Sequence, residues 1–341
     1  MVNRSILNSR PKKLLFIVNS TLIGGHEIQA RNIVKDFLAT DTSMVVLCPS
    51  REICEYFSET GAKVEYLPFN IQGRLWKQIL DRKATAKLLA SSIIGFNEVI
   101  VSGGSIEATI NAVMAIKSLN SAVHITSYVP MYIDRSITHG FSGQIYNCIL
   151  NFFATFTDEY MTVNRIQARI IKKRTGICTN YIFNRIRPVQ IPKLSLGPRL
   201  MYVGRFDDKQ KDITGLLRLL DHPNNPYKNL ILIGNGPDLE IVLDASKHTK
   251  YLKVEVKGWL SATQIDDSTG TEDVLILNSR WEGEPLVVME FLAKGLICIA
   301  KDIAGVRGVI NKKFRFRNQN ELLSILNGIR SFSSVTLNRV E

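Results

Sequence analysis

The stretch Val274–Ala300 reads VLILNSRWEGEPLVVMEFLAKGLICIA, and its pattern decides the fold class. It opens with four apolar residues and closes with the apolar run 297–300, and each run has the length of a buried strand. Between them, Pro285 suits the first position of a helix, and residues 286–293 are predicted to form that helix. A strand, a helix and a second strand in this order are the repeating unit of a parallel α/β sheet.

The same alternation runs through the 341 residues of the chain and predicts two α/β domains. In the first half we predict strands at 14–18, 44–47, 64–67, 99–101, 123–127, 159–163 and 180–183, and helices at 27–38, 53–57, 106–119, 143–156 and 165–175. In the second half we predict further strands at 200–203, 230–233 and 254–256, and further helices at 213–220 and 239–246.

Residues 185–199 between the two halves hold three prolines and little periodicity, which is typical of a linker. We therefore predict a Rossmann-like domain over 1–187, a linker over 188–198 and a second Rossmann-like domain over 199–341, with the last helix free to pack back on the first domain. Both sheets are expected to be doubly wound and to face a cleft. Ligands of such sheets bind at the carboxyl ends of the strands, so the cleft is the expected site.

Two glutamates, Glu282 and Glu290, lie in the opening stretch with seven residues between them. Gly283 permits a close backbone approach in the loop before the helix. The amides of Leu286 and Val287 are expected to point out of the helix N-terminus and to favour a bound phosphate. Carboxylates on both sides of a phosphate suit the hydroxyls of a nucleotide sugar. The alternative is a surface helix whose two acids are solvated.

This segment resembles the E-x7-E signature of the retaining glycosyltransferases of family 4, which have the two-domain GT-B fold. The likeness extends to Ser279, to the order EG-x-P and to a helix that ends in an A-x-G step. The resemblance implies that Glu282 contacts the donor sugar and that Glu290 contacts the ribose. Glu284 departs from the pattern, because this family commonly has an aromatic or aliphatic residue there. The donor-binding residues implied by the segment are Gly283, Glu284, Pro285, Leu286, Val287 and Glu290.

A second segment, Leu200–Lys211, reads LMYVGRFDDKQK and supports the same resemblance. A strand followed by Gly204, Arg205 and then lysines is similar to the family's diphosphate clamp. The resemblance implies that Arg205 and Lys211 neutralise the departing nucleotide. Lys209 is the alternative lysine, and Lys211 is preferred because it directly precedes a predicted helix. A fixed pair of cations stabilises the charge that develops on a leaving diphosphate.

Two glycine turns later in the chain resemble loops that lie beside the nucleotide in this family. The first follows the strand at 230–233 and contains Gly234, Asn235 and Gly236, and the second is Gly258 with Trp259. A dinucleotide-binding loop would need the third glycine of GxGxxG, which is missing here. Plain turns are the alternative for both segments, because glycine marks turns in general.

Near the N-terminus, residues 19–27 read NSTLIGGHE and place Gly24 and Gly25 between a strand and a helix. Paired glycines expose backbone N–H groups that can bind an anion, and the family has a glycine-rich loop here. A plain tight turn is the alternative. The family often has a histidine at the end of a middle strand of this domain, and His124 is the candidate for that catalytic role. A lone histidine within a strand is more often structural, and His26 and His139 are no better placed.

Composition excludes several classes of protein. No apolar run reaches the roughly 20 residues needed to span a bilayer, and the polar, basic N-terminus lacks the apolar core of a secretory signal. The five cysteines are scattered without a CxxC pair, which argues against a disulfide framework or zinc site. A cytoplasmic protein is expected. The net charge is +12, and most of the excess lies in residues 1–190. It favours an anionic partner, for which we expect the inner face of the cytoplasmic membrane.

The sequence therefore predicts a retaining glycosyltransferase of the type that builds bacterial lipopolysaccharide, O-antigen or capsule. The expected donor is a UDP- or GDP-linked hexose or N-acetylhexosamine, and the expected acceptor is a glycan or lipid-linked glycan. No cofactor or metal is expected, and the acid pairs 207–208 and 266–267 are interpreted as solvated turns. A sugar-nucleotide epimerase or a phosphorylase of the same architecture is the main alternative. A basic nucleic-acid-binding protein is a distant one, because the cations are not interleaved with aromatics on one face.

Overall fold

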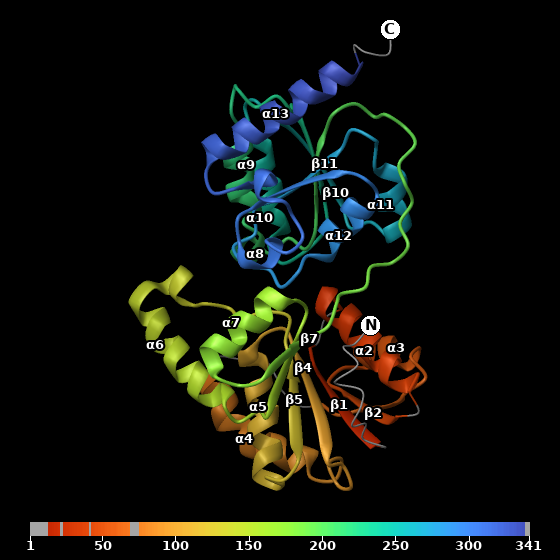
Figure 1. Cartoon of the computed structure of the whole chain (residues 1–341), viewed down its shortest axis with the longest axis vertical. Coiled ribbons are helices and arrows are strands. Elements are labelled where there is room, and N and C mark those ends of the chain that lie inside the picture. The colour runs from red at the N-terminus through yellow and green to blue at the C-terminus, as the bar shows by residue number, and fades with distance from the viewer. Residues whose placement is uncertain (1–12, 21–22, 41, 69–74, 338–341) are drawn as a thin grey trace. The chain divides into compact units, whose positions relative to one another are not determined.

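The computed structural model describes residues 13–20, 23–40, 42–68 and 75–337, apart from the side chains of 138 and 332–337. The chain divides into two compact units, Met1–Arg185 and Ile186–Glu341 (Figure 1). Each unit contains one sheet whose described strands are all parallel. The predicted fold class, two Rossmann-like α/β domains, is therefore confirmed.

The sheet of the first unit has the strand order β3-β2-β1-β4-β5-β6-β7. Its strands are β1 (Lys13–Asn19), β2 (Ser43–Cys48), β3 (Lys63–Tyr66), β4 (Glu98–Gly103), β5 (His124–Tyr128), β6 (Glu159–Thr162) and β7 (Thr179–Tyr181). Its helices are α2 (Gly25–Leu38), α3 (Arg51–Ser58), α4 (Leu75–Leu89), α5 (Ile106–Leu119), α6 (Ser136–Ala154) and α7 (Arg165–Thr175).

The sheet of the second unit has the order β10-β9-β8-β11-β12-β13. Its strands are β8 (Leu200–Val203), β9 (Asn229–Ile233), β10 (Lys253–Gly258), β11 (Val274–Leu277), β12 (Ile297–Lys301) and β13 (Arg315–Phe316). Its helices are α8 (Asp208–Lys211), α9 (Ile213–Leu220), α10 (Leu239–Lys247), α11 (Ala262–Ser268), α12 (Leu286–Ala293) and α13 (Gln319–Leu337).

Alternate residues of β1 face opposite sides of its sheet, and both sides are buried. Phe16 and Val18 pack with residues of α2 and α3, whereas Leu15 and Ile17 pack with residues of α4 and α5. A strand buried on both faces reads as a continuous apolar run, which is why the strands were recognisable in the sequence. The core of the second unit is built in the same way around β8, β9 and β11.

The strand order reverses at one place in each sheet, and this place positions the site. In the first sheet β1 pairs with both β2 and β4, and in the second β8 pairs with both β9 and β11. Successive connections leave such a point in opposite directions, so a crevice opens outside the carboxyl ends of the two central strands. The crevices lie beyond β1 and β4 in the first unit, and beyond β8 and β11 in the second.

Several elements differ from or add to the sequence-based expectation, including α4, which is not among the predicted helices. β5 begins at His124, so this residue is the first of its strand. α11 replaces the polar turn expected around residues 266–267, and it starts with a capping box in which Ser261 and Gln264 bond each other's backbone. α13 packs within the second unit, where Gln319 Nε2 donates to the Leu219 carbonyl at 3.0 Å. Among the described residues, no helix is long and apolar enough to cross a membrane.

Candidate functional site

Lys211 and Glu282 meet at the carboxyl edge of the second sheet. Lys211 Nζ lies 2.5 Å from Glu282 Oε1, and Ser279 Oγ donates to the same oxygen at 2.7 Å. Glu282 is buried, and both partners follow the central strands β8 and β11 at the point where the strand order reverses. The crevice of the second unit therefore contains a cation and a carboxylate in direct contact.

The backbone around Lys211 is shaped to hold this contact. Asp212 follows Lys211 directly, and its φ of +50° ends α8 before α9 begins. The Asp212 carboxylate accepts a hydrogen bond from the Arg280 guanidinium at 2.6 Å and another from Asn278 Nδ2 at 2.9 Å. The Arg280 N–H donates to the Gln210 carbonyl at 2.8 Å. The loop that carries Glu282 is thus fastened to the short helix that carries Lys211.

Close packing also fixes Glu282 from its other side. The 3₁₀ turn Ala304–Val306 after β12 brings Gly305 against the Glu282 backbone. A Cβ at Gly305 would lie 2.2 Å from the Glu282 carbonyl oxygen, so a larger residue does not fit there. This glycine was not singled out in the sequence, because its importance depends on a contact across 23 positions of the chain.

The predicted glycine turns come together beside this contact. The Phe206 N–H donates to the Asn235 carbonyl at 2.9 Å, and the Gly234 N–H donates to the Gly258 carbonyl at 2.8 Å. Gly234 has a φ of +150°, and a Cβ there would lie 1.9 Å from the Gly204 carbonyl oxygen. Gly236 packs equally closely on the backbone of Phe206. The carboxyl ends of β8, β9 and β10 therefore form one continuous backbone surface.

Arg205 and Trp259 are exposed on that surface. The Arg205 side chain has no hydrogen bond or ion pair within the described part of the chain. Trp259 follows the end of β10 and is 71% exposed. An uncommitted guanidinium and an exposed aromatic ring are suited to a phosphate and to a flat base, respectively.

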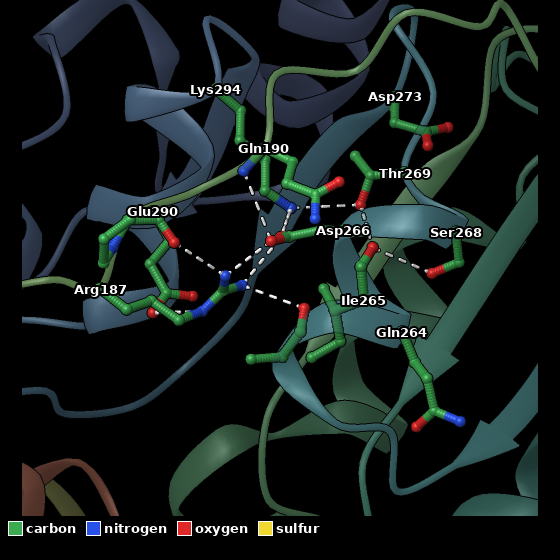
Figure 2. A network of polar contacts seen from close by, with 12 residues as sticks. Arg187, Gln190, Gln264, Ile265, Asp266, Ser268, Thr269, Asp273, Glu290 and Lys294 are labelled. Atoms are coloured by element: carbon green, nitrogen blue, oxygen red, sulfur yellow. Dashed lines mark hydrogen bonds and ion pairs between the residues drawn. The ribbon is translucent and has the colours of Figure 1, made fainter.

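Glu290 lies on α12 beside a cluster of buried charges (Figure 2). Arg187 Nε is 3.5 Å from Glu290 Oε1, and the two terminal nitrogens of Arg187 bond both oxygens of Asp266 at 2.6 and 2.8 Å. Lys294 Nζ lies 2.8 Å from Asp266, and its side chain is fully buried. Pro285 caps α12, so the amides of Leu286 and Val287 open its N-terminus one turn before Glu290.

This cluster sets the charge states of its carboxylates. The Arg187 hydrogen bonds hold the pKa of Asp266 well below its ordinary range; burial opposes this effect, and Lys294 reinforces it. The stability that Asp266 contributes is therefore present above about pH 4 and is lost as pH falls through the lowered pKa. Burial raises the pKa of Glu290, whereas the charges of Arg187 and Lys294 act in the opposite direction.

The interpretation of 266–267 as a solvated pair of acids is wrong for Asp266. Its carboxylate is buried between Arg187 and Lys294, whereas Asp267 is exposed. Asp207 and Asp208 have structural roles, because Asp207 caps α8 and Asp208 accepts from Thr214 at 2.6 and 2.8 Å. Within the described residues, no group of three or more His, Cys, Asp or Glu side chains is arranged to hold a metal ion.

His26 occupies the crevice of the first unit. Its Nδ1 lies 2.9 Å from Glu27 Oε1, its Nε2 lies 3.2 Å from Ser102 Oγ, and its ring stacks on Tyr128 at 5.2 Å between centroids. Burial alone would raise the pKa of Glu27, but hydrogen bonds, of which that from His26 is the largest, lower it overall. The second oxygen of Glu27 accepts from the Gly24 N–H at 2.8 Å. One carboxylate thus orients both the histidine and the glycine turn.

The structure places His124 at the other edge of the sheet. It is the first residue of β5, it is exposed, and its Nε2 lies 3.9 Å from Glu159 Oε2. Ligands of a parallel sheet bind at the carboxyl ends, so the expected place of His124 inside its strand and near the site is corrected to the opposite edge of the sheet. His26 is not among the predicted site residues, although its position directly after Gly24 and Gly25 is a signal in the sequence. These glycines open α2, and part of the preceding loop (residues 21 and 22) lies outside the described residues.

Residues 189–323 match the family model described as Glycosyl transferases group 1. A protein from Klebsiella pneumoniae, described as an uncharacterized 41.2 kDa protein in the cps region, is 25% identical over 314 residues; the match covers 82% of this chain and 81% of that protein.

Solved structures with the same architecture include the apo form of the lipopolysaccharide outer core galactosyltransferase WaaB. It is 21% identical, with a TM-score of 0.68, and the match covers 94% of this chain and 91% of that one. Sucrose-phosphate synthase from Thermosynechococcus elongatus is 14% identical, with a TM-score of 0.68 and coverage of 94% and 90%. The chain therefore has the GT-B fold, and the segment that matches the group 1 glycosyl transferases contains Lys211, Glu282 and Glu290.

Proposed function

We propose that this chain is a retaining glycosyltransferase of family 4 that transfers a hexose or N-acetylhexosamine from a nucleotide-diphosphate sugar to a glycan. The observation that carries the proposal is the 2.5 Å contact between Lys211 and Glu282 at the switch point of the second sheet. It places a cation suited to a phosphate beside a carboxylate suited to sugar hydroxyls. The match of residues 189–323 to the group 1 glycosyl transferases supports the same reading.

The second unit offers a separate partner for each part of the donor. Glu290 would accept hydrogen bonds from the ribose, and the amides of Leu286 and Val287 at the start of α12 would bind the diphosphate. Arg205 and Lys211 would neutralise the same diphosphate. The exposed ring of Trp259 and the backbone surface around Gly234 and Gly258 would contact the nucleoside, and Glu282 would contact the sugar.

In the proposed reaction, the acceptor oxygen bonds to the anomeric carbon while the bond from that carbon to the diphosphate oxygen breaks. Both events take place on the same face of the sugar, so the configuration is retained. The proton of the acceptor hydroxyl passes to the departing diphosphate. Arg205 and Lys211 stabilise the charge that develops on this leaving group, and preorganised charges of this kind lower barriers most effectively. Because two side-chain cations supply this stabilisation, no metal ion takes part in the proposed mechanism.

The proposed pathway is the synthesis of a bacterial cell-surface polysaccharide such as lipopolysaccharide, O-antigen or capsule. The relative described as lying in a cps region and the structural similarity to a lipopolysaccharide galactosyltransferase support this assignment. We place the enzyme in the cytoplasm at the inner face of the cytoplasmic membrane, where a lipid-linked glycan is available. The excess of basic residues in the first unit supports that location.

A screen of UDP- and GDP-sugars tests the reaction class. With a lipid-linked glycan extract as acceptor, mass spectrometry should show one donor sugar added to the glycan and one free nucleoside diphosphate released, also in the presence of a chelator. An epimerase would instead convert the donor without acceptor. Release of nucleoside diphosphate at the same rate without any acceptor, or a strict requirement for a divalent cation, would contradict the proposed mechanism.

The two glutamates should differ in what they bind. Glu290→Ala should weaken binding of the bare nucleoside diphosphate by about 1–3 kcal/mol, because the ribose hydroxyls lose a charged acceptor. Glu282→Ala should leave that affinity unchanged and lower turnover, because its partner is the sugar. Isothermal titration calorimetry with UDP and GDP, followed by steady-state kinetics, separates the two roles. Equal loss of nucleotide affinity in both variants would show that the roles are assigned wrongly.

The two histidines should differ in their effect on turnover. His26→Asn should lower turnover on the order of 10²-fold, the usual contribution of a positioned polar group or acid–base side chain in a crevice. His124→Asn serves as the matched control, because that residue lies on the same sheet at the opposite edge. The ratio of kcat values with the donor found by screening is the measurement. If His124→Asn impairs turnover more than His26→Asn, the site does not lie at the carboxyl edge.

Arg187 is a further residue that we assign to the donor site, as a positioning residue. It lies at the start of the second unit, and its Nε is 3.5 Å from Glu290 Oε1. In the proposed complex, Glu290 Oε2 would accept from the ribose. The bidentate bond to Asp266 fixes the guanidinium, and Lys294 also contacts the Asp266 carboxylate, at Oδ1 (Figure 2). Arg187 therefore holds Glu290 in place and favours its ionised form.

The chain offers a matched control for this assignment. Arg199 bonds the buried Asp273 in the same bidentate manner, at 2.6 and 2.9 Å, from the same segment, and has no contact with Glu290. Arg187→Met should raise the Glu290 pKa further, so nucleotide affinity should fall steeply as pH is lowered, by about tenfold for each unit of pKa shift. Calorimetry with UDP and GDP at pH 5.5 and 7.5, expressed relative to the wild type, tests this.

Arg199→Met should lower the free energy of unfolding about as much as Arg187→Met does. Its ratio of nucleotide affinities at pH 5.5 and 7.5 should equal that of the wild type. Arg187→Lys should restore part of the ratio, because it retains the charge. If the two methionine variants show the same pH dependence, Arg187 is only structural. If the wild type binds neither nucleotide, it is the donor site itself that fails.

A further inference from the structure

Helix α6 exposes a row of apolar side chains to solvent. Ile137, Phe141, Ile145 and Phe152 are 68, 76, 50 and 64% exposed, and Cys148 between the last two is also exposed. The backbone is non-helical at Gly140, with a φ of +53°, so Ile137 lies in a separate turn before this kink. After the kink, spacings of four, three and four residues place Phe141, Ile145, Cys148 and Phe152 on one face of the helix. We call these four residues the α6 stripe. A surface helix of a soluble domain normally has polar or charged residues on this face.

The face of α6 opposite the stripe is buried, so the stripe is not needed to hold the helix in the fold. The opposite face packs into the first unit, where Leu150 and Ala154 join a core cluster with Ile171 of α7. The 19 residues of α6 include no Asp, Glu, Lys or Arg. No charged side chain therefore interrupts the stripe, and exposed apolar patches of this kind mark sites of interaction.

Helix α7, packed beside α6, supplies positive charge and no negative charge. Its sequence RIQARIIKKRT contains five basic residues and no acid. Arg174 pairs with Asp134 at 2.8 Å. Arg169, Lys172 and Lys173 are exposed, and within the described residues they form no ion pair. In Figure 1 the two helices lie side by side in the first unit, which agrees with the shared core of Ile171 and Leu150.

We propose that the α6 stripe and the exposed cations of α7 form the surface by which the first unit binds an anionic lipid bilayer. Apolar side chains on a helix enter the boundary between headgroups and acyl chains, and neighbouring Lys and Arg bind the anionic headgroups. The cations select this occupant, because a purely apolar protein partner would gain nothing from them. The biological role of this surface rests on the proposed function, in which the acceptor is linked to lipid. Binding to a bilayer can be measured without any sugar transfer.

Sedimentation with vesicles tests the surface. We expect the wild type to bind vesicles of phosphatidylcholine with 30% phosphatidylglycerol more strongly than pure phosphatidylcholine, with binding falling as salt is raised. Phe141→Gln/Phe152→Gln should weaken partitioning at least about tenfold, because two exposed phenylalanines no longer enter the bilayer. Lys172→Gln/Lys173→Gln should weaken it about tenfold or more on anionic vesicles only. Ile241→Gln, at a side chain of α10 that is 54% exposed, is the matched control and should bind normally.

Cys148 gives a direct readout of insertion, because it lies within the α6 stripe. After Cys54→Ser and Cys178→Ser, an environment-sensitive fluorophore on Cys148 should shift to shorter wavelength when anionic vesicles are added. The proposal is overturned if the wild type ignores anionic vesicles at low salt, or if the phenylalanine variants bind as the wild type does. It is also overturned if the stripe variants abolish a dimer seen by ultracentrifugation without changing lipid binding, since the stripe is then a contact between copies. If the screen of donor sugars fails, only the proposed function is contradicted, because vesicle binding is measured independently of sugar transfer.

Discussion

The parallel pairing of β1 and of β8 with a strand on each side is the constraint on which the rest of the structure depends. All strands of a parallel sheet end at the same edge, and the reversal of strand order opens that edge at one point. His26 in the first unit and the Lys211–Glu282 contact in the second lie at these points. Glycines at the same edge allow loops to pass within backbone contact of one another, as Gly234 does on Gly204.

Buried charge fixes the site residues where hydrophobic packing alone would leave them free. Arg280 and Asp212 fasten the Glu282 loop to the helix of Lys211, and Arg187 and Asp266 fasten Glu290 to the segment that enters the second unit. Buried ion pairs add little net stability, because desolvation offsets most of the attraction, but breaking one partner is costly. They specify geometry, and a donor site needs its charged groups held within a fraction of an ångström.

The two units divide the work by their chemistry. The second unit combines cations, carboxylates and a helix N-terminus at one edge, which suits a charged nucleotide. The first unit presents the oriented His26 at its crevice and, on α6 and α7, an apolar stripe beside exposed cations. These two different surfaces suit the polar donor and the lipid-linked acceptor of the proposed function.

The sequence by itself determined the fold class, the helices and strands with continuous apolar patterns, and the spacing of Glu282 and Glu290, because periodicity and glycine turns are local properties. The residue order after a strand also predicted Arg205 and Lys211 as the cations of a diphosphate clamp, a role that belongs to the proposed function. Only the tertiary structure decided that Asp266 is buried and that Arg187 reaches Glu290, since a polar turn has the same sequence whether or not a cation from 79 positions away covers it. That His26, and not His124, lies at the carboxyl edge of the first sheet was likewise decided only by the tertiary structure. The place of His124 depends on a strand boundary that periodicity does not fix to one residue. The place of His26 depends on its stacking on Tyr128, which lies far away in the chain.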